Sequence, residues 1–119
     1  MKLALLGAFL VVVAFAAFGQ TPTVSAEPVD YCGNDAVEVP DTGSLFDFSS
    51  ACMAHDDCYE EPGTEQDRRA CDRAFLADML ASCDEMWPKQ ILRRSGCYSV
   101  AYTYFLAVRL GGWAFYDYE

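Results

Sequence analysis

Positively charged residues are scarce in this chain. Its 119 residues include 8 lysines and arginines against 18 aspartates and glutamates, which gives a formal net charge of −10. A surface this acidic repels the phosphates of nucleic acid and the headgroups of strongly anionic membranes. The charge balance therefore argues against a nucleic-acid partner and leaves neutral or zwitterionic partners open.

Repeats and strand-like patterns are also missing. No segment recurs along the chain, and no stretch of useful length alternates between apolar and polar residues, as a half-buried strand would. We therefore expect a mostly helical domain without repeats.

Long hydrophobic runs are limited to one, MKLALLGAFLVVVAFAAFG at the N-terminus. Its early position, its basic start and the small residues that follow favour a cleaved signal peptide over a transmembrane helix. Cleavage is expected before Glu27 or before Gln20. With Ala26 as the last residue removed, residues 1–26 form the signal peptide and residues 27–119 form one small, soluble domain that is secreted to the extracellular space.

All six cysteines lie beyond the predicted signal peptide. An even number of cysteines in a small exported chain predicts three disulfides, which a core of this size needs for stability. The cysteines are Cys32, Cys52, Cys58, Cys71, Cys83 and Cys97. Their number alone does not choose among the pairings.

Cap and turn signals predict three helices after an irregular loop rich in Gly, Asn, Asp and Pro. The helices are expected from Asp47 or Ser49 to about Glu60, from Thr64 to just before Pro88, and around Cys97–Leu110. Thr64 and Asp67 form a capping pair at the second start. We interpret the stretch EEPGTEQDRR around this start as a solvated turn whose acids favour the helix dipole.

The second helix carries a stripe at helical spacing that includes one carboxylate. The stripe consists of Asp72, Leu76, Met79 and Cys83. Because a carboxylate among core residues requires a partner, Asp72 is expected to pair. The aromatic tail WAFYDYE has two open alternatives: it inserts at a lipid–water boundary, or it folds back over the core.

Histidine occurs once, as His55 in ACMAHDDCYE. On a helix, His55 lies between Cys52 and Cys58, with steps of about 60° to each. The two sulfurs then point about 120° apart, so each is better placed to clamp the helix to a different segment than to bond the other. A zinc fragment Cys-x-x-His-x-x-Cys is disfavoured, because six cysteines in an exported chain are expected to be paired.

A carboxylate partner for His55 follows if Cys58 bonds Cys71. In an antiparallel helix pair, Asp72 then lies within about one turn of His55. A carboxylate in that position orients an imidazole, which can then act as general base on water. Asp56 points about 100° away, and a carboxylate beside a loop rich in Asp and backbone carbonyls suits calcium.

These residues resemble the secreted phospholipase A2 family. ACMAHDDCY is similar to its signature C-C-x-x-H-D-x-C-Y, YCG to its calcium-loop entry, and CDRAFLADM to the segment of its catalytic aspartate. GCYSVAYTYFLAVRL resembles the last helix of the small bacterial and fungal branch. The resemblance spans about Asp30–Leu110. It implies an all-α, disulfide-stapled domain with two antiparallel catalytic helices, a calcium loop and a third helix.

The resemblance implies calcium-dependent hydrolysis of the sn-2 ester of glycerophospholipids. It makes His55 the general base and Asp72 its partner, with calcium as the electrophile. Tyr59 matches the tyrosine that hydrogen-bonds the catalytic aspartate, and the Gly33 N–H helps to hold the oxyanion. The partners it implies are phospholipid membranes or micelles, and we expect a monomer.

The resemblance also implies a metal site and a disulfide pairing. Asp56 is a calcium ligand, and Asp30 with the Tyr31 carbonyl completes the upstream ligands. Because the family's Gly-rich loop after C-G is absent, the carbonyls of Tyr31, Gly33 and Asp35 are the alternative. The implied bridges are Cys32–Cys52 and Cys58–Cys71, which leaves Cys83–Cys97. The first cysteine of the C-C pair is Ala51 here.

A rival function is a non-catalytic, phospholipase-like protein that binds calcium or lipid, such as a toxin or effector. In such relatives the histidine or the adjacent aspartate is typically replaced. Both His55 and Asp56 are present, which favours the enzyme.

Overall fold

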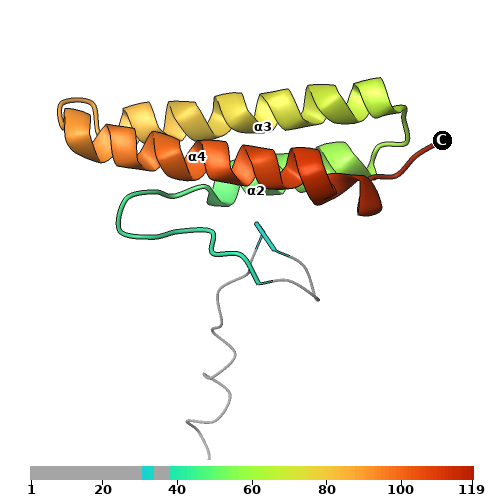
Figure 1. Cartoon of the computed structure of the whole chain (residues 1–119), viewed down its shortest axis with the longest axis horizontal. Coiled ribbons are helices and arrows are strands. Elements are labelled where there is room, and N and C mark those ends of the chain that lie inside the picture. The colour runs from blue at the N-terminus through green and yellow to red at the C-terminus, as the bar shows by residue number, and fades with distance from the viewer. Residues whose placement is uncertain (1–30, 34–37) are drawn as a thin grey trace, which may run out of the picture.

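The computed structural model describes residues 31–33 and 38–119, and this part of the chain is all-helical. Its elements are α2 (Ser49–Glu60), α3 (Glu65–Met86), α4 (Ile91–Gly111) and the short 3-10 helix η2 (Gly112–Ala114) (Figure 1). Isolated β-bridges occur among these residues, but no strand does. The predicted all-α fold is confirmed. The predicted signal peptide and Asp30 lie outside the described residues.

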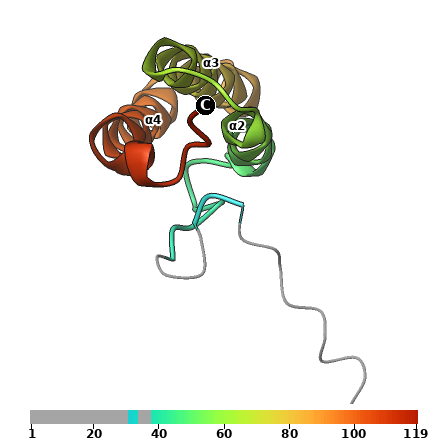
Figure 2. The same ribbon diagram turned by 90° about the vertical axis from the view of Figure 1, so that its right-hand side faces the viewer.

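The three long helices run antiparallel, each to the next, and form the corners of a triangle when viewed end-on (Figure 2). Their inward faces enclose the main apolar core, which consists of Phe48, Ala51, Cys52, Phe75, Met79, Cys83, Cys97 and Ala101. In the described part of the chain, none of the helices is long and apolar enough to cross a membrane.

The starts of α2 and α3 lie where they were predicted, but only α3 has its predicted cap, and α4 starts earlier than predicted. Thr64 and Asp67 form the predicted capping box of α3. At the start of α2 the cap position is Phe48, and the Asp47 carboxylate accepts the Ser49 N–H at 3.1 Å. α4 begins at Ile91, ahead of the predicted Cys97. Its first turn exposes its apolar side chains and therefore lacks the inward pattern from which we predicted the helix.

Three disulfides clamp the elements in sequence. Cys32–Cys52 fastens the N-terminal loop to α2, Cys58–Cys71 joins α2 to α3, and Cys83–Cys97 joins α3 to α4. This is the pairing that the resemblance implied. Each bridge stabilises a small domain by about 2–4 kcal/mol, so together they offset much of the weakness of a small core.

The loop before α2 is pinned to the other helices through its carbonyl groups. The Trp87 indole donates to the Leu45 carbonyl at 2.9 Å, and the Ser82 hydroxyl donates to that of Asp47 at 2.6 Å. From α4, the Tyr104 hydroxyl donates to Pro40 at 2.7 Å. These bonds hold the loop beside the end of α2 that carries Cys52.

The aromatic tail divides between the two alternatives. Tyr116 is buried against the Tyr59 ring, with ring centroids 5.2 Å apart. The chain beyond it pairs with the α2–α3 turn, where the Gly63 N–H donates to the Asp117 carbonyl at 3.0 Å. Trp113 and Phe115, in contrast, expose about three-fifths of their surface, 61% and 60%. The tail therefore folds back through Tyr116 and leaves two large rings in solvent.

An ionic network joins α3, α4 and the tail at Glu65. Its carboxylate accepts hydrogen bonds from Arg68 at 2.7 Å, from Arg109 at 3.1 Å and from the Tyr118 hydroxyl at 2.7 Å. The bonds from Arg68, Tyr118 and Arg109 lower the pKa of Glu65 to about 2. The prediction of a merely solvated turn is wrong at Arg68, which is 4% exposed.

Replacing Glu65 by Gln should remove a contribution to stability that depends on pH. A carboxyl group with a lowered pKa stabilises the fold above its unfolded pKa, 4.5 here, and that stability is lost as the pH falls toward about 2. We expect wild type to melt above Glu65→Gln at pH 6 and the difference in Tm to shrink over this window. Glu85→Gln, at an exposed glutamate of α3, is the control. A Tm difference that stays constant down to pH 2 would contradict the network.

Replacing Gly112 by Ala should destabilise the protein, whereas replacing Gly111 should not. A Cβ at Gly112 would lie 2.5 Å from the Tyr59 hydroxyl and 3.2 Å from an Arg68 nitrogen, but one at Gly111 meets no atom within 4 Å. Overpacking of this kind costs about 1–3 kcal/mol. Thermal melts of the two variants test the difference, and equal Tm values would show that this end of α4 is not tightly packed.

Candidate active site

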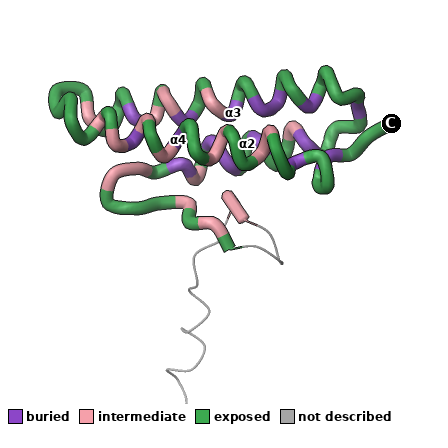
Figure 3. Tube along the Cα trace, viewed as in Figure 1, coloured by how far each residue is buried: buried purple, intermediate pink, exposed green. Residues whose placement is uncertain are grey.

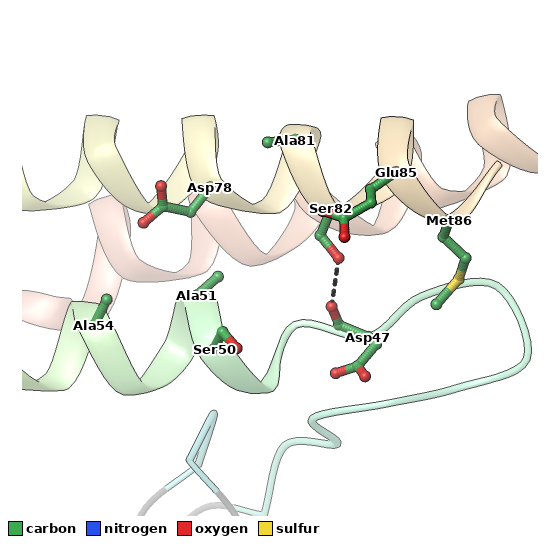
Figure 4. A pocket seen from close by; sticks show the side chains of 9 residues that line it. All are labelled: Asp47, Ser50, Ala51, Ala54, Asp78, Ala81, Ser82, Glu85 and Met86. Carbon is green, nitrogen blue, oxygen red and sulfur yellow. Dashed lines mark hydrogen bonds between the residues drawn. The ribbon is translucent and has the colours of Figure 1, made fainter. Parts of the chain in front are cut away.

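Two cavities are the main candidates for a site, and only one contains the histidine. A groove of about 680 Å³ between α2 and α3 is lined by small side chains such as Ala51 and Ala81 and by acids such as Asp78 (Figure 4). The other cavity, about 410 Å³ in volume, lies between α2 and α4 and is lined by His55 and Asp56 among mostly apolar groups. We call this second cavity the His55 pocket.

The imidazole of His55 is held by three neighbours from α2 and α3. Its Nε2 lies 2.8 Å from Oδ1 of Asp72. Its ring lies between Tyr59 and Phe75, with centroid distances of 4.2 Å and 4.4 Å. The Cys58–Cys71 bridge fixes the two helices directly beside Asp72. The antiparallel placement predicted for this pair is therefore present.

Asp72 is fully buried and receives donors from all three helices. Oδ1 accepts from His55 and from the Tyr59 hydroxyl at 2.6 Å. Oδ2 accepts from Arg109 at 2.5 Å and from Arg68 at 3.4 Å. Burial alone would raise the pKa of Asp72, but the bonds from His55, Tyr59 and Arg109 outweigh it and lower the pKa. The carboxyl group is therefore ionised at neutral pH.

An ionised Asp72 determines the tautomer of His55. A carboxylate oxygen only accepts hydrogen bonds, so the Nε2 atom that faces it carries the proton. Nδ1 is then the unprotonated nitrogen of the neutral ring. Since His55 lines the pocket, the arrangement provides a base oriented by a carboxylate at the wall of an apolar cavity.

Tyr59 makes the contact with the aspartate that the resemblance implied. Burial, together with its bond to Asp72, raises the pKa of the phenol, so Tyr59 stays protonated and donates. Its ring also separates His55 from the buried Tyr116 of the tail. Tyr59 thus positions both the carboxylate and the base.

The two arginines at Asp72 were not predicted from the sequence. Arg68 lies one turn before Asp72 on α3, a spacing at which side chains meet, so its position was a usable signal. Its guanidinium also donates to the Val108 carbonyl in the last turn of α4, at 2.9 Å. Arg109 comes from another helix, and no local pattern in the sequence indicates its contact.

The residues expected to hold calcium are present in part within the described chain. Asp56 lines the His55 pocket. Burial of its carboxyl group raises its pKa to about 6; His55 opposes the rise, and the nearby acids Asp57, Glu60 and Asp41 add to it. A carboxylate crowded by other acids favours a bound cation, and its hard oxygens suit calcium. The donor type therefore fits the expected metal.

A further acid, Asp41, organises the backbone next to Asp56. Its carboxylate accepts the N–H groups of Tyr31 at 2.9 Å and Cys32 at 2.7 Å. Because a trans peptide directs its C=O opposite to its N–H, the Tyr31 carbonyl points away from Asp41.

Among residues 31–33 and 38–119, no cluster of three or more His, Cys, Asp or Glu side chains forms a metal site. The expected ligand Asp30 lies outside these ranges.

The remaining walls of the His55 pocket combine a few polar groups with apolar side chains. Gly33, expected to donate to an oxyanion, lies in the wall beside Cys32. The Cys32–Cys52 bridge brings it there, because Cys52 lies one turn before Asp56 on α2. The apolar lining comes from Val39, Phe75, Ala107, Val108 and Phe115, among others. The wall opposite His55 is therefore mostly apolar.

Comparison with known proteins adds an independent observation. The chain matches the family model described as prokaryotic phospholipase A2 over residues 12–112. Neither the search of curated proteins nor the search of solved structures found a match. The matched range contains all the residues that line the His55 pocket except Phe115, all three disulfides and the whole of α4. The chain therefore belongs to the prokaryotic phospholipase A2 family.

Proposed function

We propose that this protein is a secreted, calcium-dependent phospholipase A2 that hydrolyses the sn-2 ester of glycerophospholipids. The observation that carries the proposal is the His55–Asp72 pair, with its 2.8 Å bond, at the wall of an apolar pocket in a chain of this family. The six paired cysteines fit an oxidising compartment, and the apolar N-terminal run supports export after removal of residues 1–26. The exported protein is a monomer in this proposal.

His55 acts as the base on water in this proposal. Nδ1 takes a proton from the water as its oxygen attacks the sn-2 carbonyl carbon. Asp72 stabilises the imidazolium that forms and keeps Nδ1 aimed at the pocket. The imidazolium then returns the proton to the glycerol oxygen as the carbon–oxygen bond breaks. The products are a free fatty acid and a lysophospholipid.

The negative charge that develops on the ester oxygen needs positive partners. The Gly33 N–H is positioned by the Cys32–Cys52 bridge to serve as one donor. Asp56, the Tyr31 carbonyl and Asp30 would hold calcium. When bound, calcium polarises the ester carbonyl and attracts the phosphate.

Substrate choice in the proposal depends on the apolar lining. The Phe75 ring stacks on the His55 ring, with centroids 4.4 Å apart. Phe75 therefore places apolar surface directly beside the imidazole. Across the cavity, Ala107 and Val108 of α4 leave room for an acyl chain. A zwitterionic headgroup suits the acidic molecule better than an anionic one, because net charge −10 repels anionic vesicles at low salt.

Replacing His55 by Gln should abolish fatty-acid release. Loss of a general base lowers the rate by about 10²–10⁴-fold, while Gln keeps a donor for Asp72. The measurement is fatty-acid release from phosphatidylcholine vesicles with calcium present, compared with Asp57→Asn, which alters a neighbouring acid outside the pocket. Retained activity in His55→Gln would reject the catalytic role. Absence of activity in wild type would favour a non-catalytic binding protein.

Replacing Asp56 by Asn should abolish the dependence on calcium. Removing one ligand charge weakens a carboxylate site for a hard cation, so activity in calcium should fall toward the level that wild type shows in EGTA. Calorimetric titration of calcium measures the binding directly. The adjacent Asp57→Asn variant is the matched control, and undiminished calcium affinity in Asp56→Asn would remove Asp56 from the ligand set.

A further inference from the structure

α4 carries apolar side chains on the side that faces away from the core. Four of them follow one another at helical spacing and continue into η2: Tyr102, Leu106, Leu110 and Trp113. They expose between 48% and 79% of their surface, and Figure 3 shows exposed residues along α4. The buried Cys97 and Ala101 occupy the other side of the helix. We call these four side chains the apolar ridge.

The apolar ridge lies in a long stretch of the chain that contains no carboxylate. No aspartate or glutamate occurs between Glu85 and Asp117, although the chain has 18 acids in total. The charges of this stretch are all positive: Lys89, Arg93, Arg94 and Arg109. Glu65 of α3 lies beside this stretch but is paired with Arg109 at 3.1 Å. An apolar helix without acids of its own can therefore approach phosphate groups that the rest of the surface repels.

The ridge adjoins the mouth of the His55 pocket. Gly111, the residue after Leu110, lines the pocket, and so does Phe115, two residues after Trp113. Phe115 is also 60% exposed, so its ring belongs to the pocket wall and to the outer surface together. A flat partner covering the ridge would therefore reach the entrance of the pocket.

The residue types of the ridge match a lipid–water boundary. Tyr102 and Trp113 combine a large ring with a polar tip, and such rings are favoured where hydrocarbon meets headgroups. Leu92, farther along the same side of α4, is exposed as well. Ser95 and Ser99 separate it from Tyr102, so the apolar surface is continuous only in the C-terminal half of the helix.

We propose that the apolar ridge is the surface by which this protein docks on zwitterionic phospholipid, with Leu110 and Trp113 in the interface. Docking in this way places the mouth of the His55 pocket against the lipid. The inference rests on the proposed function for the nature of the surface. It adds the face of the molecule and the residues that make the contact.

The first test measures binding without hydrolysis. In a His55→Gln background, co-sedimentation with phosphatidylcholine vesicles in calcium gives the partition constant. We expect Leu106→Ser with Leu110→Ser to lower it by at least about tenfold, since burying one leucine is worth about that factor or more. Met86→Ser is the matched control, because Met86 is an exposed apolar residue of the α2–α3 groove (Figure 4).

The fluorescence of Trp113 should shift to the blue on binding, and Trp113→Phe should lose that shift.

The second test separates docking from catalysis. With His55 intact, the double leucine variant should hydrolyse vesicles more slowly but should cleave a short-chain phosphatidylcholine, dispersed as monomers, at the wild-type rate. Vesicle binding that depends on the ridge without any hydrolysis would reject the proposed function and keep the docking surface. Unchanged vesicle affinity in the double variant would overturn the docking proposal. A concentration-dependent wild-type dimer that this variant abolishes would also overturn it, because a second copy would then cover the ridge.

Discussion

The buried negative charge of Asp72 is the constraint on which this small structure depends. Asp72 is 0% exposed, and an isolated carboxylate in such a place would be strongly unfavourable. His55 and Tyr59 satisfy one oxygen, and Arg68 and Arg109 satisfy the other. Removing one partner of a buried ion pair typically costs about 3–5 kcal/mol. The groups that surround Asp72, including His55, therefore also hold α2, α3 and α4 together.

The disulfides and the loop complete this arrangement from the outside. Cys58–Cys71 joins the two helices that carry His55 and Asp72, and Cys32–Cys52 brings the N-terminal loop onto α2. Asp41 then fixes the backbone of that loop through two N–H groups. The pocket is thus rigid along the α2 side, whereas its α4 side ends in exposed aromatic residues. The two sides of the pocket therefore differ in how firmly the fold holds them.

Much of the fold could be predicted from the sequence, because helix caps and turns leave strong local signals in it. The capping box at Thr64 and the turn at Gly63 define the start of α3, and a lone carboxylate on the stripe of α3 identifies Asp72 as paired. The start of α4 was missed, because its first turn faces solvent. Arg109 was missed for a different reason: its contact joins residues that are 37 positions apart, and no periodic pattern encodes it. The loop acid Asp41 likewise acts through backbone groups that the sequence does not single out.

The contact between Arg109 and Asp72 also has a consequence for the order in which the site is completed during synthesis. A chain that emerges N-terminus first presents His55, Tyr59 and Asp72 long before Arg109 exists. Until α4 has been made, the aspartate has only part of its positive neighbours, and the nascent hairpin of α2 and α3 carries a charge that it cannot bury. The Asp72 carboxylate that orients the His55 ring is therefore fully paired only once α4 packs against the α2–α3 hairpin.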